Sequence, residues 1–184
     1  MKRAARGALT VDVLVASDRW QGDEKSKAMA RRAVEQAAAA LSTKATELAI
    51  VLTDDSAIRA LNRDWRSVDA ATNVLSFPTK NAAGKHLGDI VLAFETIARE
   101  ARAGRKPLAH HLAHLAVHGF LHLVGYDHER HADAVRMEQA ERKILRRLDI
   151  PDPYRPSRGP SAKPGAKNTA KHVAKHSARR PGQS

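Results

Sequence analysis

The sequence predicts a small α/β (α+β) domain in which a mixed four-stranded sheet packs with about five helices. Short β-branched runs alternate along the chain with segments that are long enough for helices. The length of 184 residues suffices for one domain with its own core. The chain has no cysteine, which excludes disulfide bonds, thiolate metal sites and a cysteine nucleophile. No apolar run approaches the roughly 20 residues that a membrane-spanning helix requires.

Four short apolar runs predict the strands. The first run follows a basic N-terminus, so it also resembles the apolar part of a secretory signal. Asp12 interrupts this run, however, and the alternating valines around Asp12 favour a strand. Pro78 is expected to end the third strand. The four predicted strands are Val11–Ala16, Leu48–Thr53, Asn73–Phe77 and Leu87–Ala93.

Five longer segments predict helices. The first is rich in alanine and follows Asp23, which is a candidate N-cap. The second has an apolar face and a separate face that carries Arg59, Arg63 and Arg66. The five predicted helices are Lys25–Leu41, a helix that begins near Asp54 or Asp55, Glu95–Ala103, Pro107–Val124 and Ala132–Leu148.

The net charge of +12 is concentrated at the C-terminal end of the chain. Residues 151–184 contain six of the eight prolines, eight Lys or Arg and one acid, which gives this segment a charge of 8 − 1 = +7. Because the segment has no Leu, Ile, Phe, Met or Trp, we expect a disordered basic tail after a folded domain of residues 1–150. The tail either holds a phosphate backbone without sequence preference or only keeps the chain in solution.

Seven of the ten histidines lie between residues 110 and 131. His111, His114, His118 and His122 follow one face of the fourth predicted helix, whose other faces are apolar. Such a helix is usually buried, so a strip of imidazoles along it needs a chemical explanation. Either hydrogen bonds satisfy the rings, as in an ordinary core, or some of the rings bind a metal ion.

Spacing selects the histidines that can share one ion. His118 and His122 are four residues apart, which places their Cβ atoms about 5–6 Å from each other. His114 and His122 are about 12 Å apart along the helix, too far to bind the same ion. The glycine after the helix permits a turn that brings back a third ligand, His128 or alternatively His131. The pattern favours His118, His122 and His128, with a fourth position left for water.

Gly119 occupies the position next to His118 where zinc peptidases of the H-E-x-x-H type carry a glutamate as general base. The pattern therefore disfavours peptide hydrolysis, which also requires protonation of a poor leaving amine. Asp127 follows Gly125 in the expected turn, and it is either a partner that orients a ligand histidine or a plain turn residue.

The segment HGFLHLVGYDH resembles the H-G-x-L-H-L-x-G-Y-D-H signature of the YbeY family, bacterial rRNA maturation factors regarded as single-strand-specific endoribonucleases. The upstream segments LNRDWR, TNVLSFP and LGDIVLA match other blocks of the family in order, so the resemblance covers about residues 50–131. It implies one metal ion per chain, usually taken as Zn²⁺, held by His118, His122 and His128. It also implies a catalytic role for Arg66, which follows the aromatic residue of the L-N-x-x-[YW]-R block.

The resemblance further implies a role in 16S rRNA 3′-end maturation and ribosome quality control, with single-stranded RNA and the small ribosomal subunit as partners. A cytoplasmic location fits the absence of cysteine. The nucleophile is either a metal-activated water or the RNA 2′-OH. The alternative function is a non-catalytic assembly factor that binds rRNA or a ribosomal protein and contains a structural metal. Arg59 and Arg63 either line an RNA groove or form a solvated helix face.

Overall fold

The structure is a computed structural model that describes residues 9–43, 47–79 and 86–155. Within these ranges the chain forms four strands, five α-helices and the short 3-10 helix η1 (Asp18–Trp20), which precedes α1. The strands are β1 (Thr10–Val15), β2 (Glu47–Thr53), β3 (Val74–Pro78) and β4 (His86–Ala93). The α-helices are α1 (Glu24–Leu41), α2 (Asp55–Arg66), α3 (Phe94–Ala103), α4 (Leu108–Leu123) and α5 (His131–Arg146).

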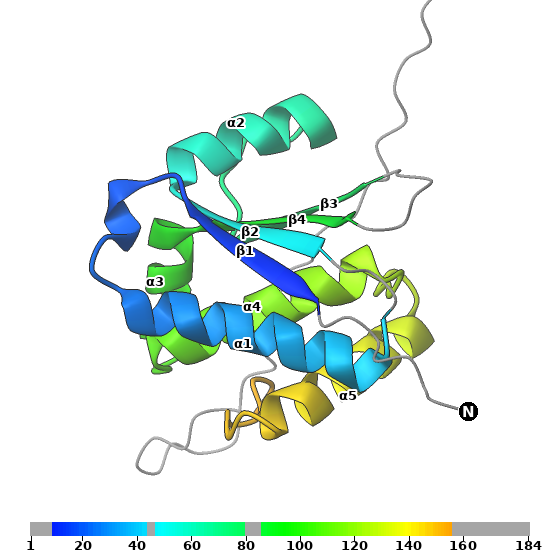
Figure 1. The fold of residues 1–184 in the computed structure, drawn as a ribbon. Helices are drawn as coiled ribbons and strands as arrows, with labels where there is room; N and C mark the ends of the chain where they lie inside the picture. Colours follow the sequence, from blue (N-terminus) through cyan, green and yellow to red (C-terminus); the bar gives the residue numbers. More distant parts are fainter. Residues whose placement is uncertain (1–8, 44–46, 80–85, 156–184) are drawn as a thin grey trace, which may run out of the picture.

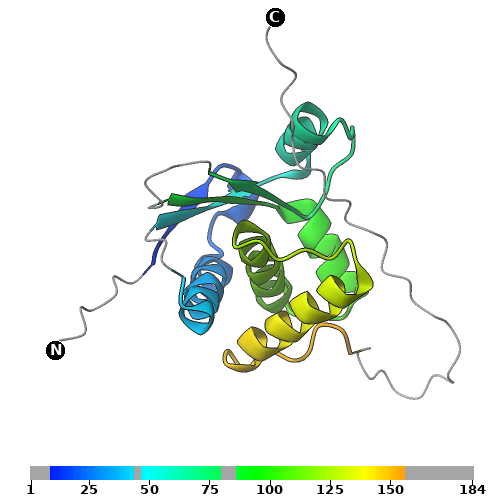
Figure 2. The same ribbon diagram turned by 90° about the vertical axis from the view of Figure 1, so that its right-hand side faces the viewer.

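The four strands form one mixed sheet with the order β1-β2-β4-β3. β1, β2 and β4 are parallel, whereas β3 pairs with β4 in the antiparallel direction and forms one edge of the sheet. α2 covers one face of the sheet, and α1, α4 and α5 lie on the other face (Figure 1). Figure 2 shows the same layers with the sheet nearly edge-on. The predicted fold class is therefore confirmed.

Side chains that alternate along the strands build a core on each face of the sheet. In β4, Ile90 and Leu92 belong to the larger core, which α1, α4 and α5 complete. Val91 and Ala93 belong to a smaller core that includes Ile58 of α2. Because both of its faces are covered, β4 is apolar along most of its length, which is typical of a buried parallel strand.

The N-cap expected at Asp23 is present, and Asp54 caps the next helix in the same way. The Asp23 carboxylate accepts a hydrogen bond from the Ser26 N–H (3.0 Å) at the start of α1. Asp54 accepts one from the Ala57 N–H (2.9 Å) at the start of α2. All nine predicted elements begin within two residues of those in the structure, and the eight whose ends were predicted also end within two residues. Pro78 is the last residue of β3. None of the described helices has the length and the apolar character needed to cross a membrane.

Trp20 lies in η1, which the sequence patterns did not predict. Its side chain is fully buried, and its indole N–H donates a hydrogen bond to the Thr53 carbonyl oxygen (2.8 Å). Its ring packs edge-to-face against Phe94, with ring centroids 4.9 Å apart. Because the indole finds its polar partner inside the protein, Trp20 anchors the connection between β1 and α1 to the end of β2.

The segment that follows α5 contacts the helical layer in its first residues. The Asp152 carboxylate accepts a hydrogen bond from Arg142 Nε (3.3 Å), and the Pro153 carbonyl oxygen accepts one from Lys106 Nζ (2.6 Å). Residues 156–184, the rest of the predicted tail, lie outside the described residues. The predicted boundary at residue 150 therefore stays a prediction.

α4 packs closely against the sheet at Gly119. A Cβ atom at this position would lie 2.8 Å from Ile90 Cγ2 and 3.0 Å from Ser76 Oγ. The Ser76 hydroxyl donates a hydrogen bond to the Gly119 carbonyl oxygen (3.1 Å). This contact determines how far α4, the helix that carries the strip of histidines, lies from the edge strand β3.

Gly119→Ala is expected to lower the free energy of unfolding by about 1–3 kcal/mol, the usual cost of overpacking a core. The sign is informative because helix propensity alone favours alanine over glycine by roughly 1 kcal/mol. Urea unfolding of the two proteins measures the difference. An unchanged or higher free energy of unfolding would show that α4 does not depend on this close contact.

Candidate metal centre

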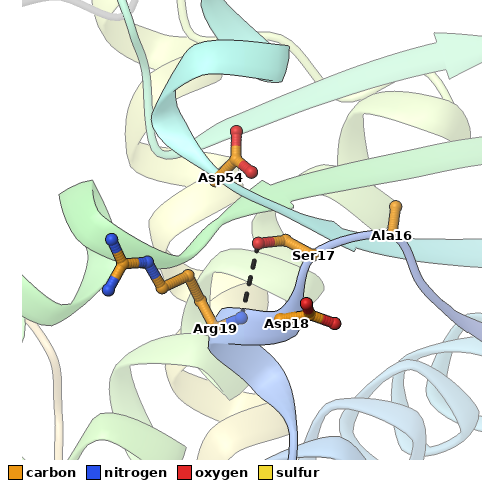
Figure 3. Close-up of a pocket in the computed structure, with 5 residues that line it drawn as sticks. All are labelled: Ala16, Ser17, Asp18, Arg19 and Asp54. Atoms are coloured by element: carbon orange, nitrogen blue, oxygen red, sulfur yellow. Dashed lines mark hydrogen bonds between the residues drawn. The ribbon is translucent and has the colours of Figure 1, made fainter.

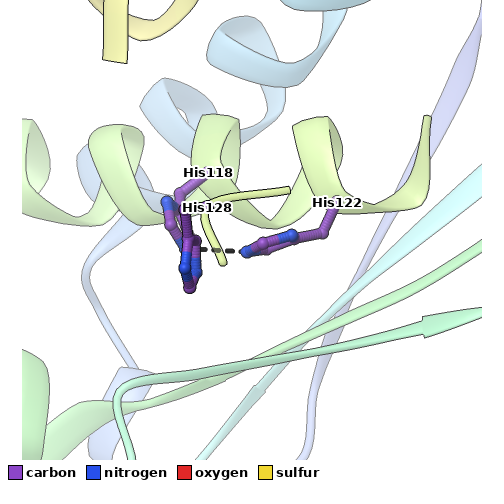
Figure 4. Close-up of side chains that lie close together, drawn as sticks. All are labelled: His118, His122 and His128. Atoms are coloured by element: carbon purple, nitrogen blue, oxygen red, sulfur yellow. Dashed lines mark hydrogen bonds between the residues drawn. The ribbon is translucent and has the colours of Figure 1, made fainter. Parts of the chain in front are cut away.

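α4 places His118 and His122 one turn apart on the same side of the helix. Their Nε2 atoms are 3.1 Å apart, and both side chains are half-buried. Most of the remaining helix surface is buried among apolar residues, including Leu112, Phe120 and Leu121. The two imidazoles are therefore held on a rigid element, and Figure 4 shows them on the side of α4 that faces the strands.

A tight turn after α4 brings His128 to the same place. The Tyr126 N–H donates a hydrogen bond to the Leu121 carbonyl oxygen (2.9 Å). The Gly125 N–H donates one to the His122 carbonyl oxygen (3.1 Å), which completes the pattern of a Schellman cap. Gly125 has a φ of +91°, a conformation that residues with side chains rarely adopt. The turn therefore depends on this glycine, as the sequence predicts.

His118, His122 and His128 form one cluster. One nitrogen of each ring lies within 4.8 Å of the other two, and the ring centroids are 4.6–5.6 Å apart. Figure 4 shows the three rings gathered beside α4. Asp127 Oδ1 accepts a hydrogen bond from the His128 N–H (2.6 Å) and so holds the loop that carries this ring. The alternative third ligand, His131, is exposed at the start of α5 and is not a member of the cluster.

Hydrogen bonds behind two of the rings determine their tautomers. His122 Nδ1 is 3.1 Å from the Tyr126 carbonyl oxygen, which can only accept, so Nδ1 carries the proton. His118 Nδ1 is 2.8 Å from a Glu141 carboxylate oxygen and donates to it in the same way. When both rings are neutral, Nε2 of each ring carries the lone pair, and the two lone pairs face each other across 3.1 Å. A cation between them would turn this repulsion into attraction.

The cluster fits a divalent metal ion. Two nitrogens bound at about 2.1 Å to a tetrahedral ion lie about 3.4 Å apart, close to the separation of the Nε2 atoms of His118 and His122. Within the described part of the chain, the cluster has three members. Structural metal sites of this kind usually have four protein ligands, whereas catalytic sites keep one position for water or substrate. The arrangement is therefore of the catalytic type.

Glu141 of α5 is a site residue that the sequence patterns did not predict. Its side chain is 0% exposed and accepts hydrogen bonds from His118 Nδ1 (2.8 Å) and His114 Nε2 (3.0 Å). Burial raises the pKa of the Glu141 carboxyl, but the hydrogen bonds from the two histidines outweigh burial and hold this pKa below its usual range. A signal was present, because Glu141 shares the apolar face of its helix with Met137 and Ile144.

The other two histidines of the strip have acidic partners. His114 shares Glu141 with His118 of the cluster. His111 Nε2 is 2.8 Å from Glu100 Oε2, and the same carboxylate accepts hydrogen bonds from the Asn73 amide. The side chain of His111 is only 12% exposed. Its hydrogen-bond partner on α3, Glu100, explains why the ring is tolerated inside.

Two of the three arginines of α2 are paired with carboxylates. Arg59 makes two hydrogen bonds to Asp69, of 2.7 and 2.9 Å, and Arg63 Nε lies 2.9 Å from Asp64 Oδ1. Both arginines are exposed. Among the described residues, no contact joins either of them to the histidine cluster, because α2 and α4 lie on opposite faces of the sheet (Figure 2).

Arg66, the last residue of α2, is half-buried. Burial lowers the pKa of its guanidinium, and no carboxylate contributes to this shift. The adjacent Trp65 packs edge-to-face on Phe77 of β3, with ring centroids 5.7 Å apart, so this end of α2 lies over the edge strand. The structure does not place Arg66 in contact with the histidines. It presents a partly desolvated cation that an anionic ligand would stabilise.

Cavities on the surface of the described residues include one beside the candidate site and one away from it. A cavity of about 560 Å³ lies where β1 and β2 end and is lined by residues that include Ser17, Arg19 and Asp54; it contains no histidine (Figure 3). A cavity of about 230 Å³ is lined by the turn after α4, including Gly125 and Asp127. The smaller cavity lies beside the loop that carries the third histidine of the cluster.

Fold and cluster together define a small mixed α/β domain with a candidate metal centre of three histidines, which leaves one coordination position for water or substrate. The chain belongs to the family described as Endoribonuclease YbeY, whose sequence model matches residues 15–149. Two relatives are named Endoribonuclease YbeY. The one from Rhodopseudomonas palustris is 51% identical to this chain over 152 residues, and the one from Nitrobacter hamburgensis is 51% identical over 155 residues. These matches cover 78% and 79% of this chain and 90% and 82% of the relatives. The resemblance found in the sequence is confirmed.

A solved structure supports the fold. The solution structure of TM1509 from Thermotoga maritima superimposes with a TM-score of 0.51. The match covers 76% of this chain and 92% of that protein, and the two are 20% identical in sequence. The architecture is therefore shared although most side chains differ.

His128→Ala is expected to reduce bound metal from about one equivalent per chain to a small fraction, because only the two ligands on α4 remain. His131→Ala is the matched control: its ring is exposed and lies outside the cluster, so this variant should keep its metal. Atomic emission spectroscopy of the purified proteins measures the metal content. Loss of metal from His131→Ala and its retention in His128→Ala would reverse the assignment.

Proposed function

We propose that the protein is a metal-dependent endoribonuclease that cleaves single-stranded RNA, with one Zn²⁺ per chain bound by His118, His122 and His128. The observation that carries the proposal is the 3.1 Å approach of the Nε2 atoms of His118 and His122. Hydrogen bonds from their Nδ1 atoms to Glu141 and to the Tyr126 carbonyl oxygen set the tautomers of the two rings. Membership of a family whose members are named endoribonucleases supports the reaction. Three nitrogen ligands with an open fourth position suit zinc.

The bound ion would supply Lewis acidity, which polarises a phosphoryl oxygen or activates the nucleophile, either water or the RNA 2′-OH. Residues of the chain prepare the site for this chemistry. The Glu141 carboxylate and the Tyr126 carbonyl keep His118 and His122 in the tautomers that direct Nε2 into the site. The hydrogen bonds also fix both ring planes, so little reorganisation is needed when a ligand binds.

Arg66 would supply a second positive group for the phosphate. Its half-buried guanidinium has no carboxylate that affects its pKa, and its planar fork matches two phosphate oxygens. Arg59 and Arg63 are proposed as weaker RNA contacts, because Asp69 and Asp64 already compensate their charges. They would attract the RNA backbone and leave the chemical step to Arg66.

The proposed substrate is rRNA, with 16S 3′-end maturation and ribosome quality control on the small ribosomal subunit as the task and the cytoplasm as the location. The net charge of +12 favours a polyanion, and an aromatic content of 4% leaves few rings for base stacking. Recognition would therefore depend mainly on the RNA backbone. The competing function is a non-catalytic assembly factor with a structural metal, and the open coordination position disfavours it.

Purified protein is expected to cleave a labelled single-stranded RNA, whereas His118→Ala should lose nearly all of this activity because the cluster loses a ligand. His131→Ala, which lies outside the cluster, should cleave like the unmodified protein. Electrophoresis of the labelled RNA after incubation with each protein measures cleavage. Equal cleavage by His118→Ala and the unmodified protein would identify a contaminating nuclease and favour the assembly factor.

Arg66→Ala is expected to keep the metal and the fold but to cleave about 100- to 1,000-fold more slowly, the usual effect of removing one charged stabiliser of a transition state. Arg66→Lys restores the charge without the two-pronged geometry, so it should recover only part of the rate. Arg59→Ala should mainly weaken RNA binding and reduce its salt dependence. Single-turnover cleavage at saturating RNA separates these effects. A normal single-turnover rate for Arg66→Ala would remove Arg66 from the chemical step.

A further inference from the structure

Tyr154 lies in the segment beyond α5 and contacts Glu141, the carboxylate behind the histidine cluster. It lies 154 − 149 = 5 residues after the last residue that the family model matches. Its hydroxyl donates a hydrogen bond to Glu141 Oε2, while Oε1 of the same carboxylate accepts one from His118 Nδ1 (2.8 Å). His114 Nε2 is the second donor to Oε2 (3.0 Å). A continuous path of hydrogen bonds therefore joins the phenol to a ring of the cluster.

Several contacts hold Tyr154 in this position. The Arg142 guanidinium lies over its ring, 4.7 Å from the centroid. Asp152 Oδ1 accepts hydrogen bonds from the Tyr154 N–H (3.0 Å) and from Arg142 Nε (3.3 Å). Lys106 Nζ binds the intervening Pro153 carbonyl oxygen (2.6 Å). The segment is thus tied both to α5 and to Lys106, two residues before the start of α4, and the phenol has a fixed place.

We propose that Tyr154 is a positioning residue of the metal centre, acting through Glu141 on His118; the inference rests on the metal site of the proposed function. A carboxylate at the end of a glutamate side chain rotates easily, because its terminal torsion is broad. Two donors on Oε2 fix that rotation and keep Oε1 directed at His118 Nδ1. Burial and the neighbouring Glu141 charge raise the pKa of the Tyr154 phenol, so the hydroxyl keeps the proton that it donates.

Tyr154→Phe tests this role because it keeps the ring beneath Arg142 and removes only the donor. We expect its zinc affinity to fall about 10-fold, at the lower end of the range for residues that support metal ligands. Glu141→Gln should weaken zinc binding about 10- to 100-fold. Because Tyr154 acts through Glu141, Tyr154→Phe should add little to the loss in Glu141→Gln. Arg155→Ala, an exposed neighbour in the same segment, is the matched control and should bind zinc normally.

The full chain is used throughout, and zinc affinity is measured by competition with a chelator. The imidazole Nδ1–H resonance of His118 is recorded by NMR in metal-free protein, where Tyr154→Phe should shift it or speed its exchange with water. The inference would be overturned if Tyr154→Phe left the zinc affinity unchanged. It would also be overturned if Tyr154→Phe lowered the zinc affinity of Glu141→Gln by a further factor of about 10. If the unmodified protein binds no zinc, the proposed metal site fails. The NMR comparison still tests the path from Tyr154 to His118, and an unshifted resonance rejects it.

Discussion

A buried helix that carries imidazoles is stable only when hydrogen-bond partners from other parts of the chain reach those rings. For α4 these partners are Glu100 on α3, Glu141 on α5 and the Tyr126 carbonyl in the turn that follows. The hydrogen bonds that make burial of the helix possible also decide which ring nitrogens carry protons. Packing of α4 and the chemistry of the cluster therefore have a common physical basis, and a substitution at Glu141 acts on both.

The separation of Arg66 from the histidines follows from the sheet. α2 and α4 cover opposite faces, so groups on these two helices can approach one ligand only around an edge of the sheet (Figure 2). β3 is such an edge and has five residues. Trp65 places the end of α2 over β3, and Gly119 lets α4 approach β3 from the other face. A long, flexible polyanion such as RNA can contact groups on both sides of this edge, whereas a small metabolite cannot.

Much of the fold and the core of the candidate site could be predicted because the signals are local. Periodicity within one segment indicated each strand and α-helix. The spacing of His118 and His122 together with Gly125 favoured the cluster, with His131 left as the alternative to His128. Glu141 could not be assigned to His118 in this way, since the two are 23 residues apart and meet only when α5 packs on α4. The burial of His111 likewise depends on α3, a separate helix. Hydrogen bonds that depend on tertiary packing leave no periodic signal in the sequence.

The two tryptophans lie in contrasting environments. Trp20 is fully enclosed and its indole N–H is bonded within the core, whereas Trp65 is 50% exposed and lies directly before Arg66. Indole fluorescence moves to longer wavelength as the ring contacts water, so the emission spectrum contains a short-wavelength and a long-wavelength component. Quenching by iodide in solution would act on the Trp65 component and spare that of Trp20. The chain thus carries its own pair of optical reporters, one for the integrity of the core and one for events at the end of α2.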